Sequence, residues 1–161
     1  MDKALLNVAE EVLRVLKANN LNLATAESCT AGLISMTLCA ASEGGANYSS
    51  GFVTYDDTAK SIMLGVKPET LSQYTAVSEQ AVREMAQGAN RVAKTQVALS
   101  VSGYAGPEGG EDGTPAGTIW FGWVFGMERA ITEVKHFEGD CEEVIRQAAM
   151  YSLKRFKSLL F

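Results

Sequence analysis

The chain has 161 residues, of which 47% are hydrophobic and 20% are charged, which is ordinary usage for a globular domain. The net charge of -5 argues against a nucleic-acid partner, because affinity for phosphate backbones comes from clustered Lys and Arg side chains. No apolar run approaches the roughly 18–20 residues that span a bilayer, and the N-terminus lacks the apolar core of a signal peptide. We therefore expect one cytoplasmic domain over residues 1–161, with no membrane partner.

The three cysteines, Cys29, Cys39 and Cys141, form no CxxC pair. This odd number of scattered cysteines indicates neither a disulfide framework nor a zinc site. Free cysteine is among the most buried residue types, so buried thiols are the simplest interpretation. We expect no bound metal.

The first forty residues predict a helix, a strand and a second helix. Apolar residues between positions 5 and 16 recur at helical spacing, and the two asparagines at 19–20 interrupt the pattern. Residues 21–26 alternate in the manner of a strand. Residues 30–41 are almost wholly apolar, so the helix that they form must be buried.

Capping residues mark the elements that follow. A short strand at 51–55 leads to Asp56 and Asp57, either of which can cap a helix that ends at Gly65. Pro68 begins a further helical turn. The sequence therefore predicts two short helices in succession.

A longer helix is predicted over residues 79–94, with Ser78 as its N-cap. Apolar residues recur along it at helical spacing. Its predicted inner stripe consists of Ala81, Val82, Met85, Ala89 and Val92.

The last part of the chain predicts three strands and a helix. Residues 96–103 and 117–126 are nearly continuous apolar runs, as in strands that are covered on both faces. Residues 130–137 form a weaker, outer strand, and residues 140–160 form a final helix that begins with a capping-box pattern. Helices and strands alternate throughout, which favours a single three-layer α/β/α domain of the α/β class with a mixed central sheet.

The longest predicted loop, residues 103–117, contains six glycines, of which Gly103 is the first. Glycine lets a backbone approach a ligand closely or adopt a positive φ. The loop lacks the lysine of a Walker motif, and its acidic residues lack the spacing of a calcium loop. It is either a surface connection or a binding element over the sheet, and the sequence leaves both open.

The segment ESCT joins the first strand to the buried helix and consists of Glu27, Ser28, Cys29 and Thr30. Free N–H groups at a helix N-terminus, together with the hydroxyls of Ser28 and Thr30, form a natural site for a phosphate or a carboxylate. Ordinary N-capping by either hydroxyl explains the pattern equally well.

Arg146 stands near the start of the last helix among apolar neighbours, so we expect it to be partly buried beside an anion. That anion is either the phosphate of a ligand or the carboxylate of Glu27. A guanidinium group pairs well with both.

His136 is the only histidine, and it lies in the weak outer strand, so a histidine-based catalytic triad is not expected. Base catalysis without histidine is usually carried by a carboxylate or by a lysine whose pKa is lowered to about 7–8 by burial. Lys60, which follows Tyr55 closely, is the best-placed lysine. The alternative, a solvated lysine on a helix surface, is favoured by the pattern alone.

Six motifs together resemble one known family. They are TAESCTAGL, GFVTYDDTAK, AVSEQAV, SVSGYAGPEGG, PAGTIWFGW and VIRQAA. Over most of its length the chain is similar to the C-terminal domain of CinA, which is also found alone as nicotinamide mononucleotide (NMN) deamidase. The resemblance implies an α/β/α domain, often oligomeric, that hydrolyses the carboxamide of NMN to nicotinate mononucleotide and ammonia.

The resemblance also implies a mechanism in which a serine attacks the amide while a tyrosine and a lysine activate it. Tyr55 and Lys60 match the last two residues. The family's serine position, ten residues before the tyrosine, falls on Gly45, so we expect this chain to lack the nucleophile. Ser49 or Ser50 could replace it only by reaching within about 3–3.5 Å of the amide carbon.

Two functions are therefore weighed. The first is an NMN amidohydrolase whose catalysis is impaired at Gly45, and the second is a non-catalytic relative that binds a pyridine mononucleotide or a related one as a sensor or partner. Tyr55 and Lys60 are expected in one pocket beside Gly45, with their polar groups within hydrogen-bond reach. The residues expected to bind the mononucleotide are Glu27, Ser28, Cys29, Thr30, Gly103 and Arg146. We expect a homo-oligomer without a cofactor.

Overall fold

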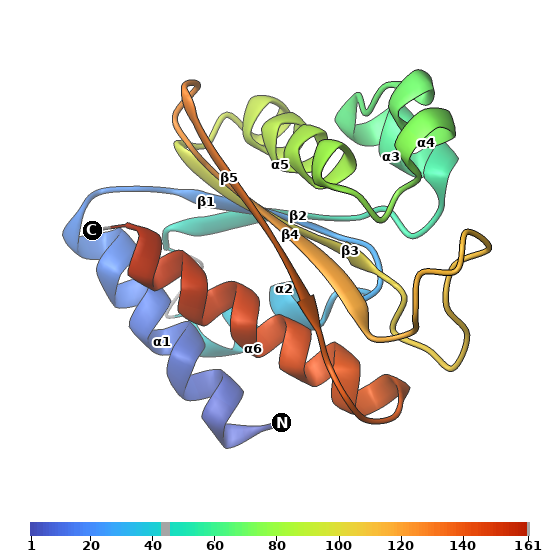
Figure 1. Cartoon of the computed structure of the whole chain (residues 1–161). Helices are drawn as coiled ribbons and strands as arrows, with labels where there is room; N and C mark the ends of the chain where they lie inside the picture. The colour runs from blue at the N-terminus through green and yellow to red at the C-terminus, as the bar shows by residue number, and fades with distance from the viewer. Residues whose placement is uncertain (43–45, 161) are drawn as a thin grey trace.

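The computed structural model describes residues 1–42 and 46–160, and the strands within them form one sheet in the order β2-β1-β3-β4-β5 (Figure 1). The strands are β1 (Leu23–Glu27), β2 (Tyr48–Val53), β3 (Val97–Gly103), β4 (Thr118–Phe125) and β5 (Arg129–His136). Strand β1 runs parallel to β2 and β3, whereas β4 is antiparallel to both β3 and β5. The predicted mixed sheet is confirmed.

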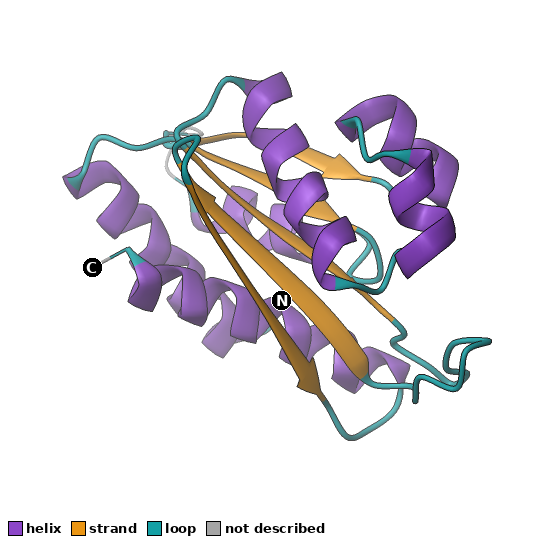
Figure 2. Cartoon of the chain, turned by 45° about the horizontal axis from the view of Figure 1, so that its top comes forward, coloured by secondary structure: helices purple, strands orange, loops and turns teal. Residues whose placement is uncertain are grey.

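Helices cover both faces of this sheet. They are α1 (Lys3–Ala18), α2 (Leu33–Ala41), α3 (Asp57–Leu64), α4 (Pro68–Tyr74), α5 (Glu79–Ala93) and α6 (Cys141–Leu159). Helices α1, α2 and α6 lie on one face, and α3, α4 and α5 lie on the other (Figure 1, Figure 2). This arrangement confirms the predicted three-layer α/β/α fold.

Strand β1 is buried along its whole length, from Leu23 to Glu27. The predicted strand at residues 21–26 is present, but helices cover both faces of β1, so its burial does not alternate along the chain. The hydroxyl of Thr25, which points into this interior, lies 2.7 Å from the hydroxyl of Tyr48. The polar side chain is therefore satisfied within the core.

Two hydrophobic clusters hold the three layers together. The larger one, under α1 and α6, includes Phe121 and Trp123, whose rings stack with centroids 5.7 Å apart. The indole Nε1 of Trp123 donates a hydrogen bond to the carbonyl of Ser152 at 3.1 Å, so the polar edge of the ring is also paired. The smaller cluster, under α5, contains Leu64 and Met85.

Side-chain caps begin three of the helices as the sequence predicts. Asp56, Ser78 and Asp140 each accept a hydrogen bond from a backbone N–H of the helix that they precede, and Gly65 ends α3 in the left-handed conformation. The predicted inner stripe of α5 is wrong at Val92, which is 49% exposed. Helical spacing gives the direction of a side chain, but it does not show how far the opposing surface extends.

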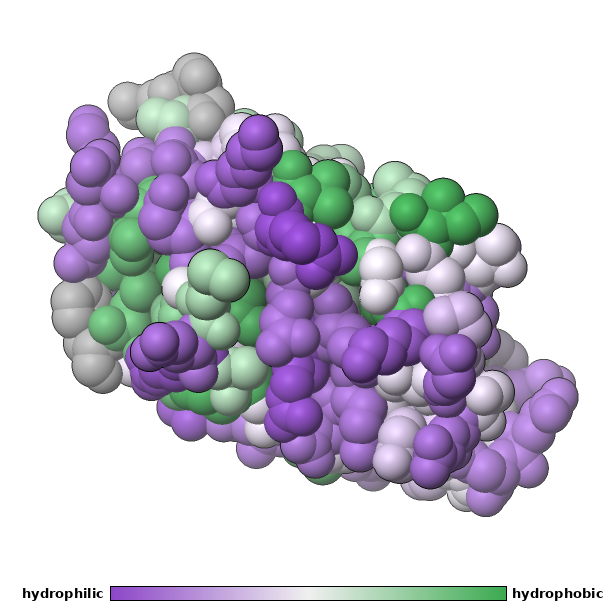
Figure 3. All heavy atoms as spheres, turned by 90° about the horizontal axis from the view of Figure 1, so that it is seen from above, coloured by the Kyte–Doolittle hydropathy of each residue, from purple (hydrophilic) through white to green (hydrophobic). Residues whose placement is uncertain are grey.

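The outer surface of the layer formed by α3, α4 and α5 is mostly hydrophilic, with separate hydrophobic areas (Figure 3). Ile62 and Met63 of α3 are among the exposed large apolar side chains. Within residues 1–42 and 46–160, none of the helices combines the length and the apolar character that crossing a bilayer requires.

Gly88 allows α5 to pack closely against the end of α3. It is buried within α5, and a Cβ atom at this position would lie 1.9 Å from the carbonyl oxygen of Leu64. Such a distance requires the backbone of one helix to move. The glycine is therefore explained by a close approach of two backbones rather than by a turn.

The change Gly88→Ala should lower the free energy of unfolding by about 1–3 kcal/mol, because overpacking outweighs a gain of about 1 kcal/mol in helix propensity. Urea unfolding of the variant measures this change. Gln87→Ala, at an exposed position of the same helix, is the matched control. A Gly88→Ala protein as stable as the wild type would contradict the close contact.

Candidate active site

A cavity of about 510 Å³ lies where the parallel strands β1, β2 and β3 end. Ligands commonly bind at this edge of α/β sheets. The wall includes Ser28, Cys29, Tyr55, Lys60, Ser102 and Gly103. Part of the glycine-rich loop and the start of α6 complete the lining, so the loop between β3 and β4 is a wall of the cavity.

Lys60 reaches this cavity from α3, and its side chain is only 1% exposed. Its Nζ atom lies 3.0 Å from Oγ of Ser28, and it donates to the carbonyl oxygens of Thr54, Tyr55 and Asp56 at 2.8, 3.2 and 3.4 Å. The alternative of a solvated lysine is therefore wrong. The pattern could not reveal this burial because the residues that cover Lys60 come from separate strands.

Burial lowers the pKa of Lys60 below its ordinary value of 10.5, against the opposing effect of Asp57 and Asp56. A lower pKa makes the neutral amine available, and a neutral amine can take the proton of the Ser28 hydroxyl. Burial also raises the pKa of the Cys29 thiol to about 12. That thiol stays protonated near neutral pH, and the side chain that contacts Lys60 Nζ is that of Ser28.

The carboxylate of Glu27 occupies the N-terminal end of α2, where the sequence predicted a ligand phosphate. Its carboxylate is fully buried and accepts hydrogen bonds from Oγ1 of Thr30 at 2.6 Å and from the backbone N–H groups of Ile34 and Ser35, both at 2.9 Å. The predicted free N-terminus for a phosphate is therefore wrong. An internal carboxylate already fills the position of the anion.

N-capping by Ser28 or Thr30 is also wrong, because α2 begins only at Leu33. The turn before it includes Ala31 and Gly32, which both have a positive φ. This turn moves the start of the helix several residues along the chain. Ser28 is left free to contact Lys60.

Arg146 is 47% exposed along its side chain and pairs with Asp2. The expectations of partial burial and of a salt bridge to Glu27 are both wrong, and Arg146 is not among the described residues that line the cavity. A helix turns about 100° per residue, so Arg146 lies about 200° around α6 from the buried Val144. Its proposed contact with a ligand phosphate stays a prediction.

Tyr55 and Lys60 share the cavity as expected, but their polar groups meet differently. Lys60 contacts the backbone carbonyl of Tyr55, and the Tyr55 side chain is 72% exposed at the rim. The same carbonyl lies 3.4 Å from Oγ of Ser28. The backbone of Tyr55, rather than its hydroxyl, therefore takes part in the polar contacts of the site.

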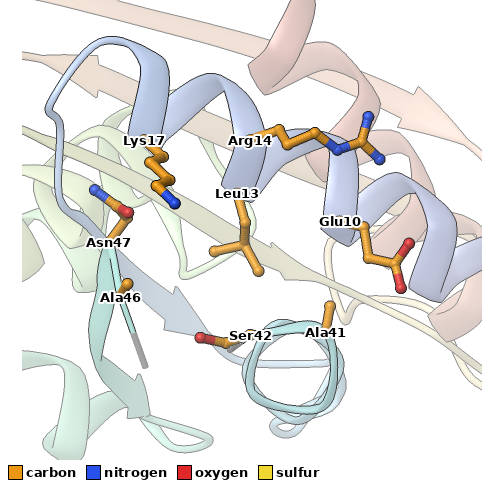
Figure 4. Close-up of a pocket in the computed structure, with 8 residues that line it drawn as sticks. All are labelled: Glu10, Leu13, Arg14, Lys17, Ala41, Ser42, Ala46 and Asn47. Carbon is orange, nitrogen blue, oxygen red and sulfur yellow. The ribbon is translucent and has the colours of Figure 1, made fainter. Parts of the chain in front are cut away.

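Gly45 lies outside the described residues, and the nearest described residues on its two sides are Ser42 and Ala46. Ser42 and Ala46 line a different cavity of about 460 Å³ beside α1, before β2 begins (Figure 4). Tyr55 and Lys60 follow the other end of β2. A six-residue strand spans roughly 20 Å, so Ala46 lies at the opposite end of β2 from Tyr55 and Lys60.

The contact between Ser28 and Lys60 is what the sequence reasoning missed, because Ser28 was interpreted only as a phosphate-binding or capping residue. Ser49 and Ser50, considered as replacements for the missing serine, are absent from the described lining of the cavity. The available signal was the position of ESCT directly after a central strand, where side chains reach the ligand edge of the sheet. The geometry supplies the parts of a serine hydrolase with a lysine base.

Comparison with known proteins places this chain in a family. A model described as the CinA C-terminal domain matches residues 5–160. Protein YdeJ of Escherichia coli (strain K12) is 46% identical over 96% of this chain and 89% of its own length. Nicotinamide-nucleotide amidohydrolase PncC of the same strain is 42% identical over 95% of this chain and 93% of its own length. The chain belongs to the CinA C-terminal domain family.

Solved structures show the same fold. The CinA superfamily protein KP700603 from Klebsiella pneumoniae 700603 is 44% identical, with a TM-score of 0.94 over 97% of each chain. The competence/damage inducible protein CihA from Agrobacterium tumefaciens is 30% identical, and its TM-score is also 0.94, over 100% of this chain and 98% of its own. The architecture is therefore kept while most residues differ.

Removal of the Glu27 carboxylate should destabilise the protein. Glu27→Ala would leave the buried N–H group of Ile34 and the partly buried one of Ser35 without acceptors, and an unpaired buried group costs about 1–3 kcal/mol. Glu27→Gln, which keeps one acceptor oxygen, should lie between this variant and the wild type. Chemical denaturation measures the series, with Glu10→Ala on the exposed side of α1 as the control. Equal stability of Glu27→Ala and wild type would contradict the capping role.

Proposed function

We propose that this chain hydrolyses the carboxamide of NMN, or of a closely related pyridine mononucleotide, with Ser28 as the nucleophile and Lys60 as the general base. The observation that carries the proposal is the 3.0 Å contact between Lys60 Nζ and Ser28 Oγ in the cavity at the strand ends. The choice of substrate is supported by the 42% identity to an amidohydrolase named for nicotinamide nucleotides.

Lys60 and Ser28 supply the proton transfers that amide hydrolysis needs. The neutral amine of Lys60 takes the hydroxyl proton of Ser28 as Oγ attacks the carboxamide carbon. The resulting ammonium of Lys60 then protonates the amide nitrogen, so the C–N bond breaks and ammonia leaves an ester on Ser28. Water, deprotonated by the neutral Lys60, attacks that ester and releases the carboxylic acid. Lys60 finally returns the proton to Oγ of Ser28.

Catalysis by Ser28 does not need a hydroxyl at position 45. The expectation of impaired catalysis assumed that the nucleophile stands where Gly45 does, and it remains a prediction against which the Ser28 proposal can be tested. The second candidate, a non-catalytic protein that binds a mononucleotide, is kept because YdeJ, at 46% identity, is not named for an activity. A homo-oligomer and a cytoplasmic location also remain predictions.

Ser28→Ala should lower kcat for ammonia release from NMN by about 10⁴–10⁶-fold, because loss of a nucleophile removes the covalent route. Ser49→Ala, which changes an exposed serine of β2, is the control and should leave the rate unchanged. Gly45→Ser should give no gain. Turnover that survives in Ser28→Ala, or that appears only in Gly45→Ser, would contradict the proposed nucleophile.

The pH dependence of kcat/KM tests the base. Because burial lowers the pKa of Lys60, and because only the neutral amine accepts a proton, activity should rise with pH through an apparent pKa below 10.5. Lys60→Arg keeps a cation that stays protonated, so activity and this ascending limb should both be lost. A pH profile of Lys60→Arg that matches the wild type would exclude Lys60 as the base.

The non-catalytic alternative predicts a different result. A ligand that binds only the folded state raises the melting temperature of a protein. A thermal shift with NMN in the absence of any ammonia release by the wild type would select the binding protein over the enzyme. Ammonia release that depends on Ser28 would select the enzyme.

A further inference from the structure

Two serines on the same face of β3 differ in their hydrogen bonding. Ser100 is fully buried and donates to the carbonyl of Val82 in α5 at 2.6 Å. Ser102 follows two residues later, so its side chain points to the same side of the sheet. It is 1% exposed and lines the candidate active-site cavity. Among the described residues, no side-chain hydrogen bond involves its hydroxyl.

Strand register places Ser102 beside Ser28. Glu27 pairs with Val101 in the parallel ladder, and the N–H of Ser28 donates to the carbonyl of Val101 at 3.0 Å. Ser28 and Ser102 are the next residues on these two strands, which lie about 4.8 Å apart in a sheet. Both residues line the same cavity.

Lys60 approaches Ser28 from the other side. Its Nζ atom contacts the carbonyls of Thr54 and Tyr55, which follow β2, whereas Ser102 lies near the end of β3. Strand β1, with Ser28 at its end, runs between β2 and β3. A carboxamide attacked by Ser28 would therefore have the base on one side and the hydroxyl of Ser102 on the other.

We propose that Ser102 is a further catalytic residue, whose hydroxyl donates a hydrogen bond to the carbonyl oxygen of the carboxamide as that oxygen becomes negative. This inference rests on the proposed function, since the charge forms only when Ser28 attacks. A fixed donor aimed at a developing oxyanion lowers the barrier most where water is excluded, as in this largely buried position. No bond to Ser102 itself forms or breaks.

Ser102→Ala should lower kcat for NMN by about 10²–10³-fold, the usual cost of removing one donor to an oxyanion, with little change in KM. Ser100→Ala is the matched control, because it removes a hydroxyl from the same face of the same strand. Ser100→Ala should lower the melting temperature and leave kcat unchanged. Ser102→Ala should lower kcat and leave the melting temperature unchanged.

A thioamide analogue of NMN separates oxyanion stabilisation from a packing role. Sulfur accepts hydrogen bonds more weakly than oxygen, so the wild type should favour the carboxamide over the thioamide. This preference, measured as the ratio of the two kcat values, should be smaller in Ser102→Ala and unchanged in Ser100→Ala. A ratio that is equal in Ser102→Ala and the wild type would contradict the contact with the carbonyl oxygen.

The two proposals fail in different ways. A wild type that releases no ammonia from NMN would overturn the proposed function, and this inference with it. An active wild type whose kcat is unaffected by Ser102→Ala, or whose KM alone rises, would overturn the inference and leave the role of Ser28 intact.

Discussion

The buried carboxylate of Glu27 is the contact on which the site depends. Its three hydrogen bonds hold the start of α2 against the end of β1. Side chains alternate along a strand, so when Glu27 faces α2, Ser28 must face the opposite side, toward α3. One residue therefore sets both the connection between strand and helix and the direction of the serine. A water-exposed carboxylate could do neither, because it would gain little from the helix N–H groups.

The polar groups around the cavity are arranged to keep a lysine buried. Three carbonyl oxygens receive Lys60 where strand β2 ends, and they offset part of the cost of its burial. Among the described residues that line the cavity, Lys60 is the one Lys or Arg. The two places expected to hold a phosphate are already engaged, since Glu27 fills the helix end and Arg146 pairs with Asp2. The described lining of the cavity thus supplies a lysine for proton transfer beside Ser28.

Most of the fold could be predicted from the sequence, because its signals are local. Periodicity located the helices, and short polar residues such as Asp56 and Ser78 marked their starts. The site was harder to predict because its contacts join residues that are distant in the sequence. Lys60 and Ser28 are separated by 32 residues, and a local sequence pattern does not show which distant residues meet in the fold. The wrong prediction that Arg146 is partly buried has a different cause. Its angular position on the helix relative to Val144 already indicated exposure.

Resemblance to a family shows which residue types match its motifs. Catalysis also requires that the base contact the group from which it takes a proton. Counting back from Tyr55 led to Gly45, which lies outside the described residues, and β2 separates the nearest described residue after it, Ala46, from Tyr55. A base must lie within hydrogen-bond reach of the proton that it takes, about 2.6–3.2 Å. Ser28 meets this condition with Lys60, although the two are farther apart in sequence than Gly45 and Lys60. Among the described residues, Ser28 is therefore the serine whose hydroxyl lies within reach of the Lys60 amine.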